Sequence, residues 1–180
     1  MRKMLLAATA TLGLASAAQA VPIAAGSVLN IVGNANFNAT SVSFTNPANL
    51  VAGSGDFVAL GTCSGCVTMT TPLDYVTPQT GSAYSATNNA LTTSFSVVSG
   101  GQISGDGITT LGLQFAGVAS LTGFDDTPGI WIVTLNQFGT LIGSFSASTI
   151  ATGGGAAPEP ATLAILGTGL VGLAALRRRR

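Results

Sequence analysis

The 180-residue chain contains six basic and six acidic side chains and no histidine. All six basic residues lie at the two ends: Arg2, Lys3, Arg177, Arg178, Arg179 and Arg180. Residues 21–157 contain no Lys or Arg, and their only charged side chains are Asp56, Asp74, Asp106, Asp125 and Asp126. Nucleic-acid binding needs cations that displace counterions from phosphates, and a serine nucleophile needs a neighbouring base. The composition therefore excludes a nucleic-acid partner and predicts a protein that is not an enzyme.

Residues 1–20 have the three parts of a secretory signal peptide. Arg2 and Lys3 supply the positive start, residues 4–14 are apolar, and Ala18-Gln19-Ala20 is a small-x-small cleavage site. We predict cleavage after Ala20, so that Val21 is the first residue of the exported protein. A retained membrane anchor is the alternative, but the apolar core is too short to span a bilayer.

Residues 21–152 form one predicted domain that is rich in Ser, Thr, Asn and Gly. Several runs alternate apolar and polar side chains, which is the period of a half-buried strand, and turn-forming residues separate them. This pattern favours an all-β fold, an antiparallel β-sandwich or jelly roll of about eight strands. The predicted strands are residues 28–32, 37–44, 57–60, 67–70, 91–98, 111–115, 131–136 and 141–148.

The aromatic residues allow two interpretations. Trp131, Tyr75 and Tyr84 have rings that could stack on sugars. Trp131, however, is in phase with Val133 and Leu135, and this alternation predicts that it lies in the core.

Two local predictions concern turns. The apolar side chains change face within residues 37–44, which predicts a β-bulge near Thr40-Ser41. Residues 137–140 are expected to make a tight hairpin connection between the strands at 131–136 and 141–148. The expected separators between strands are Asn46-Pro47, residues 53–56, Gly100-Gly101, residues 105–107 and residues 125–129.

Cys63-Ser64-Gly65-Cys66 is the most conspicuous motif of the body. An exported protein meets an oxidising compartment, so the first interpretation is a disulfide that pins a turn between the strands at 57–60 and 67–70. A redox pair would need a helix after the first cysteine, where a strand is predicted. A zinc site would need two more ligands, which no His or other Cys can supply. Free thiols are the remaining alternative.

Asp125, Asp126 and Asp106 are the candidate oxygen ligands for Ca²⁺. Their spacing does not match an EF-hand loop, and adjacent aspartates in a Pro-Gly turn are more often solvated turn formers. We therefore predict no bound metal and no cofactor.

The C-terminal tail has three parts that follow a Gly/Ala linker at residues 153–157. Pro158, Glu159 and Pro160 come first, then 16 uncharged residues at 161–176, then Arg177, Arg178, Arg179 and Arg180. As a helix, residues 161–176 would be about 24 Å long, short against a hydrocarbon core of about 30 Å. This predicts a weakly held transmembrane helix whose arginines stay on the cytoplasmic side.

This order of parts resembles the PEP-CTERM sorting signal. The resemblance covers residues 158–180 and is supported by the signal peptide at 1–20. It implies processing by exosortase, a membrane cysteine transpeptidase or protease, in a Gram-negative bacterium that makes exopolysaccharide. It also implies an inner-membrane-anchored precursor and a product at the cell surface or outside the cell.

The sequence therefore predicts a non-enzymatic surface or matrix protein, with Pro158, Glu159 and Pro160 as the processing motif. The membrane and exosortase are its expected partners, and exopolysaccharide is a further one. Two alternatives remain: a carbohydrate-binding module of the biofilm matrix, with or without calcium, and a permanently anchored single-span protein.

Overall fold

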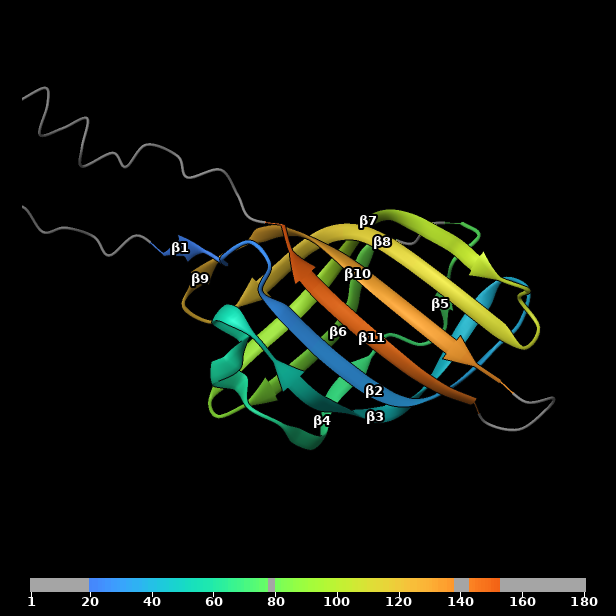
Figure 1. The fold of residues 1–180 in the computed structure, drawn as a ribbon, viewed down its shortest axis with the longest axis horizontal. Coiled ribbons are helices and arrows are strands. Elements are labelled where there is room, and N and C mark those ends of the chain that lie inside the picture. Colours follow the sequence, from blue (N-terminus) through green and yellow to red (C-terminus); the bar gives the residue numbers. More distant parts are fainter. Residues whose placement is uncertain (1–19, 78–79, 138–142, 153–180) are drawn as a thin grey trace, which may run out of the picture.

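The computed structural model describes residues 20–77, 80–137 and 143–152, which are mostly β-structure (Figure 1). The strands are β1 (Val21–Pro22), β2 (Val28–Phe37), β3 (Ser41–Gly53), β4 (Cys63–Met69), β5 (Leu73–Asp74), β6 (Gly81–Asn88), β7 (Leu91–Gly105), β8 (Thr110–Leu121), β9 (Phe124–Asp125), β10 (Thr127–Asn136) and β11 (Gly143–Ala151). A 3₁₀ helix, η1 (Gly55–Leu60), follows β3.

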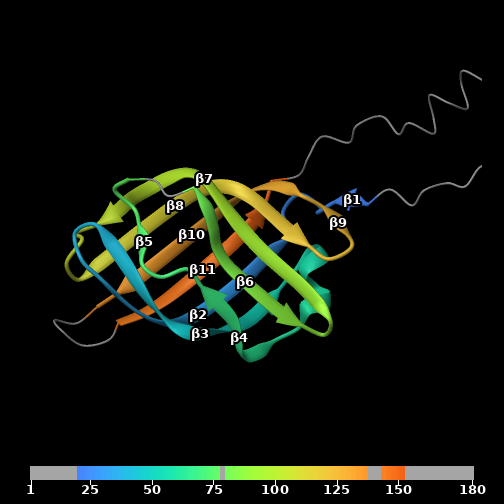
Figure 2. The ribbon, with the colours of Figure 1, turned by 180° about the vertical axis from the view of Figure 1, so that it is seen from behind.

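Eight strands form a closed antiparallel barrel, in which each strand pairs with the next barrel strand along the chain. The order is β2, β3, β4, β6, β7, β8, β10 and β11, and the ring closes because β11 also pairs with β2. One wall, made by β2, β11, β10 and β8, faces the viewer in Figure 1, and β7, β6 and β4 face the viewer in Figure 2. The three two-residue strands lie outside this ring: β5 pairs with β3, and β1 pairs in parallel with β9.

The predicted all-β antiparallel fold is confirmed, but the predicted sandwich is wrong. Two packed sheets would each end in edge strands, whereas here the first and last barrel strands pair over eight registered positions, from Val28↔Ile150 to Ala35↔Gly143. Alternation decides only which side chains point inward, and it is the same in a barrel and in a sandwich. Barrel closure therefore could not be predicted from the pattern.

Trp131 is fully buried in the barrel interior, as its phase with Val133 and Leu135 predicts. The rings of Phe115, Tyr84, Phe95 and Phe44 surround it, with centroids 5.5, 6.0, 6.3 and 6.4 Å from its own. Aromatic pairs of this kind stabilise a fold by about 0.5–1.5 kcal/mol each, beyond the stabilisation that comes from burying their apolar area. These aromatic side chains come from β3, β6, β7, β8 and β10, so the cluster connects both walls of the barrel.

One buried polar pair sits beside this cluster. The hydroxyls of Tyr84 and Thr149 are 2.6 Å apart and form a hydrogen bond across the interior. The bond satisfies groups that would be costly to bury alone. Burial raises the pKa of Tyr84, so its hydroxyl stays protonated.

Several predicted strands are confirmed with the predicted inward faces. Phe95 and Val97 are buried in β7, and Leu113 and Phe115 are buried in β8. In β11 the described residues alternate from Gly143 onward between buried and more exposed positions. β10 and β11 pair in antiparallel fashion as expected, but most of the predicted connection at 137–140 lies outside the described residues.

The change of face within residues 37–44 is a hairpin, not the predicted bulge. β2 ends at Phe37 and β3 begins at Ser41, so the two apolar sets belong to different strands. The Asn38 side-chain oxygen accepts the N–H groups of Thr40 and Ser41, both at 2.9 Å. This local turn competes with a continuous strand and explains the break.

Two other predictions are wrong. Residues 57–60 belong to η1 and not to a strand, and Phe57 and Leu60 of this helix are fully buried. Three expected separators lie inside strands: Asn46-Pro47 in β3, Gly100-Gly101 in β7 and residues 127–129 in β10.

A bulge explains the proline inside β3. Val32 pairs with Asn49 and Asn34 with Thr45, so residues 46–48 lie opposite Gly33 alone. Proline is tolerated at such a position, where its missing N–H is not needed by the ladder. Gly33 fits there because a Cβ would lie 2.6 Å from Cε1 of Phe145.

No helix in the described part of the chain is both long and apolar enough to cross a bilayer. The predicted transmembrane helix at 161–176 lies outside the described residues.

Candidate functional site

Both ends of the described chain leave the barrel at one pole, which we call the terminal pole: residues 20–27, η1, residues 122–126 and Thr152 (Figure 1). The Gly26 N–H donates to the Ala151 carbonyl at 2.8 Å, and the Ala151 N–H donates to the Ser27 carbonyl at 3.0 Å. Thr152 donates its N–H and its hydroxyl to the Pro128 carbonyl, each at 2.9 Å. The chain is therefore fixed to the barrel up to Thr152, the last residue before the predicted linker at 153–157.

Ile23 closes the barrel interior at the terminal pole. Its side chain is 1% exposed, and its N–H donates to the Thr127 hydroxyl oxygen at 2.8 Å. The buried Thr127 hydroxyl in turn donates to the Asp125 carbonyl at 2.9 Å. The Ala24 N–H donates to the Asp56 carboxylate at 2.6 Å. The first residues after the predicted cleavage site are thus part of the fold.

The surface of the terminal pole is acidic and partly apolar. It carries Asp56, Asp125 and Asp126, three of the five carboxylates of the body, and Asp126 accepts a hydrogen bond from the Ser120 hydroxyl. The apolar side chains of Val21 and Val58 are 65% and 66% exposed. Because residues 21–157 contain no Lys, Arg or His, no side chain of the body neutralises these acids.

The opposite pole, formed by residues 38–40, 74–77 and 106–109, is held by short-range side-chain bonds and by bonds from Tyr75 to the carbonyls of Asn38 and Thr40. The Asp106 carboxylate accepts the Thr109 hydroxyl at 2.5 Å and the N–H groups of Ile108, Thr109 and Thr110 at 2.8–2.9 Å. The Thr109 hydroxyl and then these N–H groups hold the pKa of Asp106 well below its usual range.

Asp74 repeats this arrangement at the same pole. Its carboxylate accepts the Thr77 hydroxyl at 2.6 Å, the Val76 N–H at 2.9 Å and the Thr77 N–H at 3.1 Å. The pKa of Asp74 is lowered for the same reason, with the Thr77 hydroxyl making the largest contribution. Both carboxylates therefore act as turn formers.

The structure does not bring the three calcium candidates together. Asp106 lies at the opposite pole, and Asp125 and Asp126 lie at the terminal pole. Among the residues that the structure describes, no three Asp, Glu or Cys side chains are placed to hold a metal ion. The oxygen atoms of Asp106 already accept hydrogen bonds from their own turn.

A shallow pocket of about 180 Å³ lies near the opposite pole. Hydroxyl, amide and glycine residues of β7, β8 and β10 line it, together with the side chains of Leu111 and Leu135. It is smaller than typical small-molecule sites, which are about 300–1,000 Å³, and no charged side chain lines it. Its composition indicates no catalytic group.

The aromatic residues considered for sugar stacking are not available on the surface. Trp131 and Tyr84 are fully buried, and Tyr75 is 4% exposed with its hydroxyl donating to the Asn38 carbonyl at 2.5 Å. In the ranges 20–77, 80–137 and 143–152, every aromatic side chain is buried or partly buried. The outward faces there consist mainly of Ser, Thr, Asn and Gly, with some exposed Val and Ile side chains such as Val98 and Ile103.

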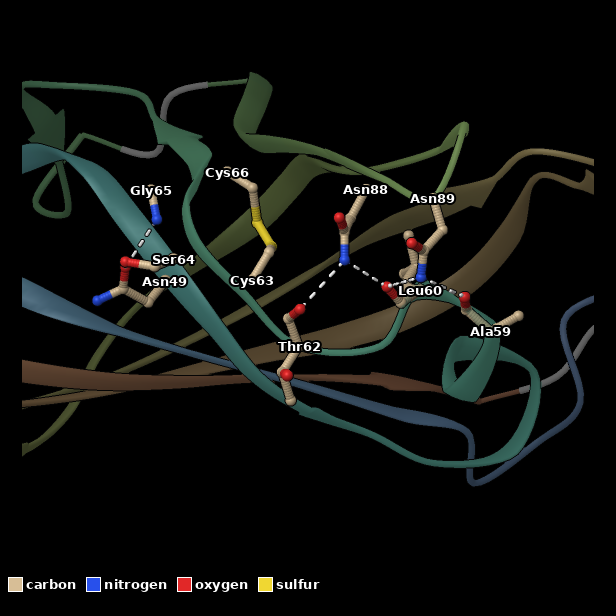
Figure 3. Close-up of a disulfide and its surroundings, with 10 residues drawn as sticks. All are labelled: Asn49, Ala59, Leu60, Thr62, Cys63, Ser64, Gly65, Cys66, Asn88 and Asn89. Carbon is tan, nitrogen blue, oxygen red and sulfur yellow. Dashed lines mark hydrogen bonds between the residues drawn. A yellow bond between two sulfur atoms is a disulfide. The ribbon is translucent and has the colours of Figure 1, made fainter.

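Cys63 and Cys66 form a disulfide within β4, with Cα atoms 5.9 Å apart (Figure 3). Cys63 pairs with Leu50 and Val67 with Ala48, so residues 64–66 bulge opposite Asn49 alone. The Asn49 side-chain oxygen accepts the Gly65 N–H at 2.8 Å and the Ser64 hydroxyl at 3.2 Å. The disulfide therefore closes a bulge in a strand, and not the predicted turn between two strands.

Asn88 and Asn89 lie near this bulge in the β6–β7 turn and were missed by the sequence analysis (Figure 3). Asn88 donates to the Leu60 carbonyl at 2.7 Å and Asn89 donates to it at 3.0 Å, which ties the turn to the end of η1. Asn89 and Ala90 have φ angles of 51° and 61°, as a type I′ hairpin requires. The adjacent asparagines, a residue type that favours tight turns, were the feature of the sequence that could have predicted this hairpin.

The residues predicted for sorting and export lie mainly outside the described ranges. The structure does not describe Ala18, the processing motif Pro158, Glu159 and Pro160, or the four terminal arginines. Ala20 is exposed at the first described position, and Val21 begins β1.

The fold and the position of the tail define a class: a closed all-β barrel that continues into a C-terminal sorting segment. The family model of the PEP-CTERM protein-sorting motif matches residues 156–180. The chain therefore carries a PEP-CTERM motif, as predicted, and is an exported protein that passes the membrane and is targeted to exosortase. No curated protein and no solved structure matches the chain.

Proposed function

We propose that the protein is a non-enzymatic structural component of the cell surface or extracellular matrix. The observation that carries this proposal is the sorting motif at 156–180, which follows the barrel after a short linker. In the precursor, residues 161–176 hold the chain in the inner membrane and the four arginines keep its end cytoplasmic. Exosortase then cuts near Pro158, Glu159 and Pro160 and frees or transfers an acidic barrel in an exopolysaccharide-producing Gram-negative bacterium.

The described residues support a role without catalysis. Residues 21–157 offer no His, Lys or Arg, so a serine or cysteine has no imidazole, amine or cationic side chain to activate it. The carboxylates of Asp74 and Asp106 are engaged in their own turns, at the other end of the barrel from the acids of the terminal pole.

Mass spectrometry of cell and medium fractions tests the processing step, in a strain with exosortase and in its deletion mutant. We expect released protein without Arg177, Arg178, Arg179 and Arg180 only where the enzyme is present. A P158A/E159Q/P160A variant is expected to stay unprocessed, whereas the control T162S is cut normally. Released protein that retains the arginines would contradict the proposal, and uncut membrane-bound protein would favour the permanent anchor.

Carbohydrate binding by the barrel is the second candidate function. Its support is the outward Ser, Thr and Asn rows, such as Ser148, whose hydroxyl donates to the Asn30 side chain at 2.6 Å. Because the aromatic rings are buried and cannot stack on a sugar, the barrel would bind carbohydrate through hydrogen bonds from these polar side chains. Retention on immobilised host exopolysaccharide, measured with calcium and with chelator, tests it, and elution in the void volume under both conditions would reject it.

A further inference from the structure

We propose that the terminal pole is the docking surface on which exosortase meets this substrate, and that the partner surface beside the enzyme's cleft is basic. The inference rests on the proposed function and adds that the folded barrel is part of what the enzyme binds. Three observations carry it: where the fixed chain ends, how much chain follows, and what covers the pole.

The first observation is that the C-terminal segment is fixed to the pole through Thr152. Ala151 is fully buried and exchanges hydrogen bonds with the Gly26–Ser27 backbone, and Thr152 is held on the Pro128 carbonyl by two bonds. Freeing these residues would open the pole that Ile23 closes. The tail therefore starts at a defined point on the barrel surface.

The second observation is the length of chain between that point and the motif. Five residues, 153–157, separate Thr152 from Pro158. At up to about 3.6 Å per extended residue, Pro158 stays within about 22 Å of Thr152. A protein that binds Pro158, Glu159 and Pro160 is then held beside the terminal pole.

The third observation is the chemistry of the pole. Asp56, Asp125 and Asp126 gather there beside exposed Val21 and Val58, and residues 21–157 contain no Lys, Arg or His. Such a surface complements a partner that is basic and partly apolar, and complementary charges raise the rate of encounter.

The charge test compares the two poles in the full-length protein, processed by exosortase in membranes. D125N/D126N removes two charges at the terminal pole, and the matched control D74N/D106N removes two at the opposite pole. We expect tail removal to slow about threefold for the first variant and to stay unchanged for the control. Equal slowing of both variants, or no slowing of D125N/D126N, would overturn the proposal.

The tether test changes only residues that precede the matched motif at 156–180. Deletion of residues 153–155 places Ala156 next to Thr152, so the barrel blocks the cleft and processing falls about tenfold or more. Insertion of ten Gly/Ser residues leaves processing within about twofold, because the pole can still reach the partner. Processing of the deletion variant at the wild-type rate would overturn the docking geometry. Failure of the wild-type protein to be processed would instead reject the proposed function.

Discussion

The two poles of the barrel are built from different kinds of interaction. At the opposite pole, Asp74 and Asp106 bond to residues two to four positions further along the chain. At the terminal pole, the Ile23 N–H bonds to Thr127, 104 positions away, and Gly26 bonds to Ala151. The aspartate turns of one pole are therefore encoded by neighbouring residues, although Tyr75 also bonds to Asn38 and Thr40 there, and the other pole exists only when the whole barrel is formed.

This difference has a physical consequence for stability. Local turns can form with little loop-closure cost, whereas contacts between distant segments require the ordered chain between them. Substitution of a buried residue that forms the terminal pole should therefore lower the free energy of unfolding strongly. Substitution of an exposed residue in the turns of the opposite pole should lower it little.

Trp131→Ala should have the largest effect, because it removes the ring that four aromatic neighbours surround. We expect a loss of about 3–5 kcal/mol in the free energy of unfolding, measured by denaturant titration. Both poles should unfold in one transition, since the aromatic cluster joins both walls. A separate melting step at either pole would contradict a single shared core.

Ile23→Ala should destabilise the terminal pole through the cavity left under β1. Because Ile23 is 1% exposed, we expect a loss of about 3 kcal/mol in the free energy of unfolding. The matched control is Ile108→Ala at the opposite pole, where the side chain is 73% exposed and the change should stay within about 0.5 kcal/mol. Equal losses at the two positions would remove the distinction between the poles.

Cys63→Ser with Cys66→Ser should have an intermediate effect, because the disulfide closes only a short loop within β4. The chain-entropy argument gives about 2 kcal/mol at most for the loss in unfolding free energy. Thermal unfolding of the double variant, beside wild type with and without reductant, measures it. A loss as large as that of Trp131→Ala would mean that the bulge at Asn49 supports more of the fold than we infer.

The smallest effect should come from Asp74 and Asp106 and should depend on pH. Their folded-state pKa values are lowered, so the stability that they contribute is present above the unfolded pKa, about 4, and is lost as the pH falls below it. D74N/D106N should therefore flatten the fall in stability between pH 5 and pH 3, measured by denaturant titration. An unchanged pH profile would show that these turns add nothing to folding.

Local information was enough to predict many inward faces. The alternation of Trp131, Val133 and Leu135, and that of Phe95 and Val97, depends only on the two-residue period of a strand. The short apolar run at 57–60 was misread as a strand. Phe57 and Leu60 are three positions apart, which places them on one side of a 3₁₀ helix, and both are buried in η1, whose end is bonded to Asn88 and Asn89.

The candidate site divides in the same way. The sorting tail was predictable because Pro158, Glu159, Pro160 and the terminal arginines form a contiguous signal, which the family model at 156–180 confirms. The terminal pole was not predictable, because its aspartates belong to segments that are distant in the chain. Asp56 precedes Asp125 and Asp126 by about 70 residues, and only the barrel brings them to one surface.

The sequence by itself determined the sorting motif, the absence of cations from the body and the inward side of several strands. All three follow from the identity and spacing of side chains. Only the tertiary structure decided that the strands close into a barrel and that both chain ends leave at one pole. Pairing between β2 and β11 uses backbone N–H and C=O groups that nearly every residue carries, so it leaves no mark in the sequence.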